Sequence, residues 1–168
     1  MKKHLSLIIL LGVVIFLACL CFKQLFPSSL EAHNFYQQGL SFLEKEDYQN
    51  AYYNFSKIKT NAKIYPLALY RQAFCAEKLN DFSSSAIKYM TFEKKYPNSI
   101  FAARALYESA KAHIKLKDYT TSEMMLKKIQ SQYPDTDYAI GANYFLGIIY
   151  KEKAKIENEF NIYTNIAN

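Results

Sequence analysis

The chain has 168 residues, of which 51% are hydrophobic and 21% charged, a composition that excludes a disordered chain and suits one domain of ordinary size. Four Gly and four Pro are too few turn residues for a β-sandwich, so we expect helices joined by short loops. Three of the 21 basic residues lie in residues 1–30, which hold no acidic residue, so 18 basic and 15 acidic side chains remain for the rest. Because none of these basic residues form a cluster, we expect no nucleic-acid binding.

The N-terminal residues 1–26 are predicted to be a membrane segment, followed by a linker at residues 27–30. Lys2 and Lys3 precede an uncharged run of 18 residues from Leu5 to Phe22, and Lys23 ends it. As a helix this run is about 27 Å long, close to the hydrocarbon thickness of a bilayer. One interpretation is an uncleaved signal anchor that keeps the N-terminus in the cytoplasm and the chain after Lys23 outside.

Two other interpretations of this segment remain open. Phe16-Leu17-Ala18-Cys19 resembles a bacterial lipobox, although Phe16 and Leu17 match it poorly. That resemblance implies cleavage before Cys19 and a lipid on its thiol. The segment could also be a buried helix of a soluble protein. In the first two cases we expect the folded part to be tethered outside the cytoplasmic membrane, in the periplasm if the cell has an outer membrane.

The folded part contains an internal repeat, which fixes the architecture before any single motif is interpreted. Three Asp-aromatic pairs lie 34 and 37 residues apart: Asp47-Tyr48, Asp81-Phe82 and Asp118-Tyr119. A small residue stands eight positions before each Asp, and again 37 positions after the last of these: Gly39, Ala73, Ala110 and Gly147. Four, eight and eleven positions after each Asp come a small residue and two bulky ones, as in Ser85, Tyr89 and Phe92. Pro97 and Pro134 close the second and third units.

This repeated spacing of small, bulky, Asp and Pro residues predicts a helical hairpin in each unit. The small residues let two antiparallel helices approach closely, and the bulky residues at helical spacing fill the space between hairpins. The Asp begins the second helix, because an anionic side chain accepts hydrogen bonds from free backbone amides. The proline ends the unit, because it cannot continue a helix.

On these positions the chain resembles the tetratricopeptide repeat over about residues 31–157. The resemblance implies an all-α fold, a right-handed α-solenoid of antiparallel helix pairs, preceded by the N-terminal transmembrane or signal helix. The units would be residues 31–63, 64–97 and 98–134, with a final helix at 137–157 and a C-terminal tail or cap at 158–168. Gln38, Gln72 and Ser109 depart from the family by replacing an apolar residue just before the small one, and Lys63 stands where a proline is expected.

The junctions at residues 96–99 and 133–136, Tyr-Pro-Asn-Ser and Tyr-Pro-Asp-Thr, are similar to the variant of this repeat found in bacterial envelope proteins. These include the lipoprotein subunit of the β-barrel assembly machinery, the periplasmic Tol-Pal coordinator and the helical platform of soluble lytic transglycosylases.

The resemblance also implies that the first helix of each unit lines a concave, peptide-binding face. Every unit has a tyrosine three positions before the small residue, and the position after the small residue lies on the same face. The candidate groove residues are Tyr36, Leu40, Tyr70, Phe74, Tyr107, Lys111, Tyr144 and Ile148. The structural alternative is that these tyrosines cover neighbouring helices, a role in which tyrosine is common at this position.

Few residues suggest catalysis or a metal site. The three histidines are far apart in the sequence, and no HExxH motif, paired cysteines or glycine-rich phosphate loop is present. We expect His113 to be a packed ring and Cys75, the one cysteine of the folded part, to be a small buried residue. No cofactor and no metal is therefore expected.

The sequence thus favours a non-catalytic scaffold that is tethered to the bacterial envelope and binds envelope proteins. The alternative is a truncated or split helical platform of a lytic transglycosylase-like enzyme, although nothing resembles that enzyme's catalytic domain. The apolar residues of the C-terminal end could pack on the last helix or complete a fourth hairpin, and self-association through an uncapped last helix is a third possibility.

Overall fold

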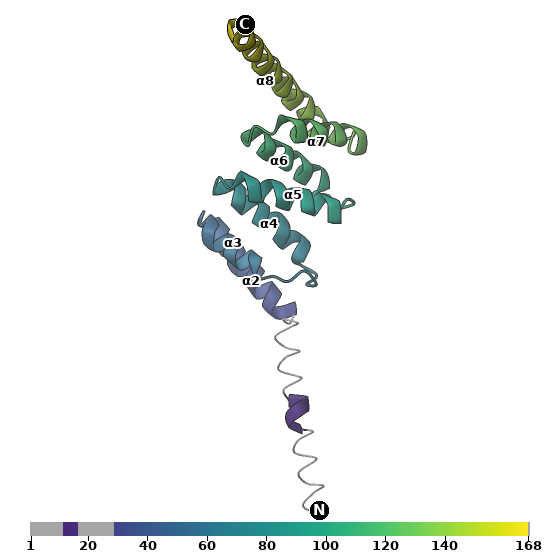
Figure 1. Ribbon diagram of the computed structural model, residues 1–168. Coiled ribbons are helices and arrows are strands. Elements are labelled where there is room, and N and C mark those ends of the chain that lie inside the picture. The colour runs from purple at the N-terminus through teal and green to yellow at the C-terminus, as the bar shows by residue number, and fades with distance from the viewer. Residues whose placement is uncertain (1–11, 17–28, 168) are drawn as a thin grey trace, which may run out of the picture.

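The computed structural model of the protein describes residues 12–16 and 29–167, and within these residues it is entirely helical (Figure 1). Residues 12–16 form a short helical piece, while the rest of the predicted membrane segment lies outside the described residues. In the part of the chain that the structure describes, no helix combines the length and the hydropathy needed to cross a bilayer. The main helices are α2 (Ser29–Glu44), α3 (Tyr48–Ser56), α4 (Tyr65–Lys78), α5 (Phe82–Lys95), α6 (Ala102–Lys115), α7 (Tyr119–Gln132) and α8 (Asp137–Ala167).

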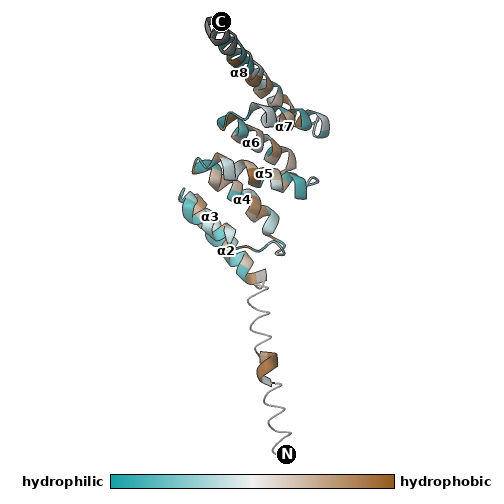
Figure 2. Ribbon diagram, in the orientation of Figure 1, coloured by the Kyte–Doolittle hydropathy of each residue, from teal (hydrophilic) through white to brown (hydrophobic). Residues whose placement is uncertain are grey.

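These helices form three consecutive hairpins and a last single helix, stacked in chain order (Figure 1). Each helix packs against the next one in the sequence, and α6 also packs against α8. Hydrophilic and hydrophobic residues are mixed along each of the stacked helices, whereas residues 12–16 are mainly hydrophobic (Figure 2). The predicted all-α fold is therefore confirmed over residues 29–167, and the helix pairs extend from α2 to α7.

The turn inside each hairpin is built in the same way three times. A residue in the left-handed region, with φ between 57° and 60°, comes directly before the Asp: Glu46, Asn80 and Lys117. The backbone N–H of each Asp then donates to the carbonyl five residues earlier at 2.9 Å, which caps the first helix. Each Asp side chain accepts an N–H bond of 3.0–3.1 Å from the third residue after it, which caps the second helix.

The connections between hairpins follow the predicted prolines where these are present. Helices α5 and α7 end at Lys95 and Gln132, two residues before Pro97 and Pro134. In the first unit, where Lys63 replaces the proline, α3 ends earlier, at Ser56, and residues 57–64 form turns.

The last helix differs from the prediction. It runs to Ala167, so it continues through residues 158–167 of the predicted tail and does not end near residue 157. Ala154 and Lys155 stand 37 positions after the turn residues Lys117 and Asp118. Alanine is the strongest helix former, and a lysine side chain has no acceptor with which to begin a new helix. Nothing therefore turns the chain at this point.

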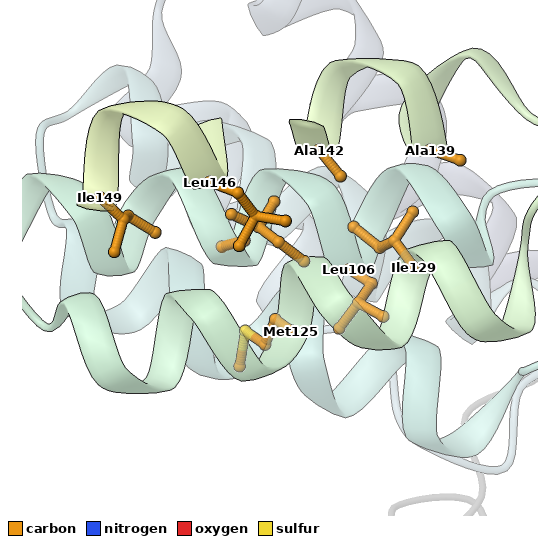
Figure 3. Close-up of a cluster of buried hydrophobic side chains, with 9 residues drawn as sticks. Leu106, Met125, Ile129, Ala139, Ala142, Leu146 and Ile149 are labelled. Carbon is orange, nitrogen blue, oxygen red and sulfur yellow. The ribbon is translucent and has the colours of Figure 1, made fainter. Parts of the chain in front are cut away.

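The core consists of clusters between successive helices, and the small residues set the spacing. Ala73 and Ala110 are completely buried. A Cβ atom added to Gly39 would lie 2.5 Å from the ring of Phe55 in α3. The last cluster brings together Leu106 of α6, Ile129 of α7 and Leu146 of α8 (Figure 3).

The polar residues that replace an apolar one before the small residue have partners on the preceding hairpin. The Gln72 amide donates to the Phe55 carbonyl at 3.0 Å, and the Ser109 hydroxyl donates to the Ala86 carbonyl at 2.9 Å. Gln38, which has no hairpin before it, is exposed. Two of the departures from the family pattern, Gln72 and Ser109, thus make buried hydrogen bonds between repeats, which satisfy polar groups inside the array.

Candidate functional site

The candidate groove residues lie on α2, α4, α6 and α8, the first helices of their units. Each of these helices contributes one tyrosine and, four residues later, one residue of the second row. The structure therefore places all eight candidates on successive first helices, but it gives the tyrosines and the second row different environments.

The first two of the four tyrosines are buried, and the last two are more exposed. Tyr36 and Tyr70 are only 8% and 6% exposed, Tyr107 is half-buried, and Tyr144 is 69% exposed. Burial raises the pKa of Tyr70 to about 12. These side chains do not form one row of accessible rings, and for Tyr36 and Tyr70 the structural alternative holds: they are core residues.

Tyr70 shows why the first tyrosines are buried. Its ring centroid lies 5.4 Å from those of Tyr89 and Phe92 in α5 and 5.2 Å from that of Phe101 at the start of α6. Such edge-to-face and tilted contacts stabilise aromatic pairs beyond the area that they bury. Tyr70 therefore joins two hairpins.

Tyr107 makes the same kind of aromatic contacts with α8 but remains partly accessible. Its ring lies 5.4 Å from that of Tyr138 and 5.5 Å from that of Phe145. Burial raises its pKa, and the nearby Lys111 charge opposes this rise. The Tyr107 hydroxyl fits above Gly141, where a Cβ atom would lie 2.6 Å from the oxygen.

The second row, one position after each small residue, is half-buried in all four units: Leu40, Phe74, Lys111 and Ile148. Phe74 packs edge-on against Tyr48 at 6.2 Å, and the Lys78 ammonium lies 5.4 Å from its ring centroid. The Lys111 ammonium lies 5.7 Å from the ring centroid of Tyr107. This row offers accessible apolar and cationic groups on neighbouring helices.

A charged cluster, formed by Glu77 of α4 and by Glu108 and Lys111 of α6, lies next to this row. Lys111 hydrogen-bonds to Glu108, and the Tyr89 hydroxyl donates to Glu77 at 3.4 Å. Burial, together with the negative charge of Glu108, raises the pKa of Glu77, while Lys111 opposes the rise. Burial disfavours the charged form of Lys111, but the bond to Glu108 and the surrounding negative charge outweigh this and raise its pKa.

A small pocket of about 40 Å³ opens beside this charged cluster. Phe82 at the start of α5 and Lys115 of α6 contribute to its lining. The pocket therefore combines one aromatic ring with both signs of charge.

The sequence prediction missed both glutamates of the charged cluster. Glu77 lies three positions after Phe74, on the next turn of the same helix face, and Glu108 lies three positions before Lys111. Extending the predicted face by one helical turn would have included them. Their electrostatic interaction with each other depends on how tertiary structure places α4 relative to α6, which no spacing within one helix specifies.

The residues considered for catalysis have structural environments. Cys75 is completely buried, as predicted, and burial raises the pKa of its thiol to about 12. His113 is half-buried, and its Nδ1 lies 3.0 Å from the Asp118 carboxylate that caps α7. Within residues 12–16 and 29–167 no group of three His, Cys, Asp or Glu residues is arranged to hold a metal ion.

Comparisons with known proteins identify the repeat. The family model of the tetratricopeptide repeat matches residues 67–99 and 104–136, which contain most of α4–α5 and α6–α7. A similar solved structure is the TPR2B domain of yeast Sti1 in complex with pHsp70. It is 20% identical, covers 75% of this chain and 98% of its own, and has a TM-score of 0.58. The comparison with curated proteins found no match. The chain therefore contains tetratricopeptide repeats and has the fold of a tetratricopeptide repeat domain.

Proposed function

We propose that this tetratricopeptide repeat array is a non-catalytic scaffold that binds a segment of another protein along its first helices. Its N-terminal segment would tether it to the bacterial cell envelope, with the array outside the cytoplasmic membrane. The observation that carries the proposal is the half-buried second row, with the charged cluster of Glu77, Glu108 and Lys111 beside it.

The second row has the properties of a peptide-binding surface. Its members project from successive first helices and keep part of their surface accessible, so that one extended or helical segment could contact several of them. Phe74 and Ile148 supply apolar area, whereas Tyr36 and Tyr70 are buried in the core and are not available to a partner.

The charged cluster suggests what such a segment would carry. Lys111 and Lys115 can donate hydrogen bonds to a carboxylate of the partner, and Glu77 can accept one from a basic group. Half-buried charges discriminate between partners more than exposed ones do, because solvent screens them less. We infer a partner segment with an apolar side chain over Phe74 and a charged one over Lys111.

The fold comparison supports protein binding in general terms. The TPR2B domain of Sti1 is a protein-binding domain in its own structure, a complex with pHsp70. Its similarity to this chain concerns the fold, so the partner of this chain has to be identified by experiment.

Site-specific crosslinking in cells would test the proposed surface. A photoreactive amino acid at Lys111 should trap a discrete partner, whereas the same amino acid at Lys127, which is exposed on α7, should not. Identification of the trapped protein would name the partner. Equal trapping at both positions, or none at Lys111, would remove the second row as the binding surface.

Neutral variants provide a quantitative check with the identified partner. Lys111→Gln combined with Lys115→Gln should weaken binding about tenfold, the equivalent of about 1.4 kcal/mol. The matched control is Lys127→Gln, which also breaks an ion pair with a glutamate, Glu123, but lies on α7. Binding that is unchanged in the double variant would contradict the proposal.

The tether needs a separate test. Deleting residues 1–26 should release the chain from the membrane fraction, and Cys19→Ser should do so only if the chain is a lipoprotein. Retention of the deleted chain in that fraction would show that the array itself, or its partner, binds the membrane.

A further inference from the structure

The last helix has the features of a first helix, but within the described residues no second helix packs against it to complete its unit. Helices α2, α4 and α6 are each followed by a turn and a partner helix, whereas α8 continues without a break. Gly147 occupies the position that corresponds to Gly39. A Cβ atom on Gly39 would collide with Phe55 of the partner helix, but around Gly147 there is nothing within 4 Å.

Around Gly147, α8 has an exposed and largely apolar face, which we call the outer face. Ile140 is 72% exposed, Tyr144 69% and Tyr150 48%, and Ala154 is exposed as well. With about 100° per residue, all four side chains project within about 60° of the direction of Gly147.

The inner side of α8 is already used. Ala142, Leu146 and Ile149 are buried in the cluster with α6 and α7 (Figure 3). The outer face therefore adds to the side that holds α8 on the array, except at its edge, where the Tyr150 hydroxyl also donates to Glu123 of α7 at 3.4 Å. It is the side on which a partner helix would lie if the unit were complete.

The outer face is self-complementary in an antiparallel arrangement. Tyr144 and Tyr150 each lie three residues from Gly147, and Ile140 and Ala154 each lie seven residues from it. If two copies of α8 cross antiparallel at Gly147, each Tyr144 meets the partner's Tyr150. Each Ile140 meets the partner's Ala154, a large residue against a small one, as interdigitating helices require.

We propose that a second copy of this chain covers the outer face. The two α8 helices pair antiparallel about a twofold axis at Gly147, and each takes the place of the helix that the other lacks. Such an interface is isologous, because the same patch serves both chains. The orientation is the one that the array itself uses, since every complete unit here is an antiparallel hairpin.

The charges on the outer face agree with this pairing. Lys151 is the one charged side chain among the residues that face outward between 140 and 154, and in the dimer it would lie opposite Asn143, four residues to the other side of Gly147. The two Lys151 side chains would be separated by about 12 Å along the helices, more than a Debye length of about 8 Å at physiological salt. A parallel pairing would instead bring the two lysines together.

The dimer should be weak, because the contact extends over only about 21 Å of helix from Ile140 to Ala154. Contacts of this size are at the lower end of specific interfaces. We therefore expect a concentration-dependent equilibrium between monomer and dimer in the micromolar range. The proposal rests on other observations than the proposed binding surface, although Tyr144 was also predicted as a groove residue.

Disulfide trapping tests the twofold axis directly. With helix axes about 8–10 Å apart, the two residues at position 147 have Cα atoms about 5 Å apart, within the range of a disulfide. In the full chain with Cys19→Ser and Cys21→Ser, and with the buried Cys75 retained, Gly147→Cys should form disulfide-linked dimers at least tenfold faster than Ile156→Cys. Ile156 is 53% exposed on the opposite side of α8. Equal rates for the two variants would overturn the proposal.

Gly147→Glu tests the same pairing without a crosslink. The side chain enters open space in the monomer, so the helical circular dichroism signal should not change. In sedimentation of the full chain in mild detergent, Gly147→Glu should raise the dissociation constant of the dimer at least tenfold. Ile156→Glu should leave this constant unchanged. A wild-type chain that stays monomeric at about 200 µM, or a dimer that is insensitive to Gly147→Glu, would refute the pairing.

Discussion

Three glycines of the array allow the packing to be tested with one substitution, glycine to alanine. The atoms nearest to an added Cβ atom on Gly39 are ring atoms of Phe55, at 2.5, 2.7 and 2.8 Å. Phe55 is 0% exposed, and its ring lies 5.4 Å from the ring of the buried Tyr36, so it has little room to move. An added Cβ atom on Gly147 would have no atom within 4 Å apart from those of its chain neighbours and of the nearby backbone of its own helix.

The opposing contributions at Gly39 can be estimated. Alanine is favoured over glycine inside a helix by about 1 kcal/mol. Overpacking a filled core costs about 1–3 kcal/mol, and a contact of 2.5 Å with a rigid ring belongs at the upper end of that range. Gly39→Ala should therefore lower the free energy of unfolding by about 2 kcal/mol, whereas Gly147→Ala should raise it by about 1 kcal/mol.

Gly141→Ala should fall between these two variants. Its added Cβ atom would meet the Tyr107 hydroxyl at 2.6 Å, but this is the far end of a half-buried side chain that can shift. The gain in helix propensity and the cost of moving the tyrosine should nearly cancel.

Thermal unfolding followed by circular dichroism at 222 nm would measure the series, at a concentration at which sedimentation shows the chain to be monomeric. At about 2–4 °C per kcal/mol, Gly39→Ala should lower Tm by about 4–8 °C and Gly147→Ala should raise it by about 2–4 °C. A Gly39→Ala chain that is as stable as the wild type would refute the view that the Gly39–Phe55 contact sets the spacing of α2 and α3.

Four further predictions concern polar groups of the array. Ser85 is completely buried, and its hydroxyl has no hydrogen-bond partner among the described residues, so Ser85→Ala should raise the free energy of unfolding by about 1 kcal/mol. Ser122→Ala removes a 2.9 Å hydrogen bond to a backbone carbonyl, so it should lower the free energy of unfolding by about 1 kcal/mol. Urea titration would measure both serine variants. Hydrogen bonds at the start of α7 lower the pKa of Asp118 below 3.8, so its stabilising effect is present above that pH and is lost as the pH falls through the folded-state pKa. The stability difference between the wild type and Asp118→Asn should therefore shift against the wild type in acid, and a difference independent of pH would contradict this. Glu93 is 3% exposed and pairs with Lys128 at 2.7 Å, so Lys128→Met should destabilise by about 1–3 kcal/mol. Adding Glu93→Gln should restore much of this loss, and a double variant as unstable as the sum of the singles would argue against coupling.

The local features of the fold were available in the sequence. The Asp caps, the prolines after α5 and α7 and the spacing of the small residues each act through neighbours within one or two helical turns. The continuation of α8 was equally local, since Ala154 and Lys155 replace the turn residue and the cap. A closer comparison of the fourth unit with the other three would have predicted it.

The environment of the candidate site was decided by tertiary structure. Tyr36 and Tyr144 occupy the same repeat position, yet one is 8% and the other 69% exposed. Tyr36 is covered by the ring of Phe55 from its own second helix, whereas no second helix covers Tyr144 in the part of the chain that the structure describes. The burial of a residue depends on which helices surround it, and this differs between the middle and the ends of an array.

The sequence by itself thus determined the repeat, its caps and the first helices on which a binding surface would lie. Tertiary structure decided which of those residues remain accessible, how Glu77 meets Lys111 across two helices, and that the outer face of α8 is left uncovered. The physical reason is the range of the interactions. Capping and periodicity act within a few residues of the chain, whereas burial and charge pairing depend on residues that only packing brings together.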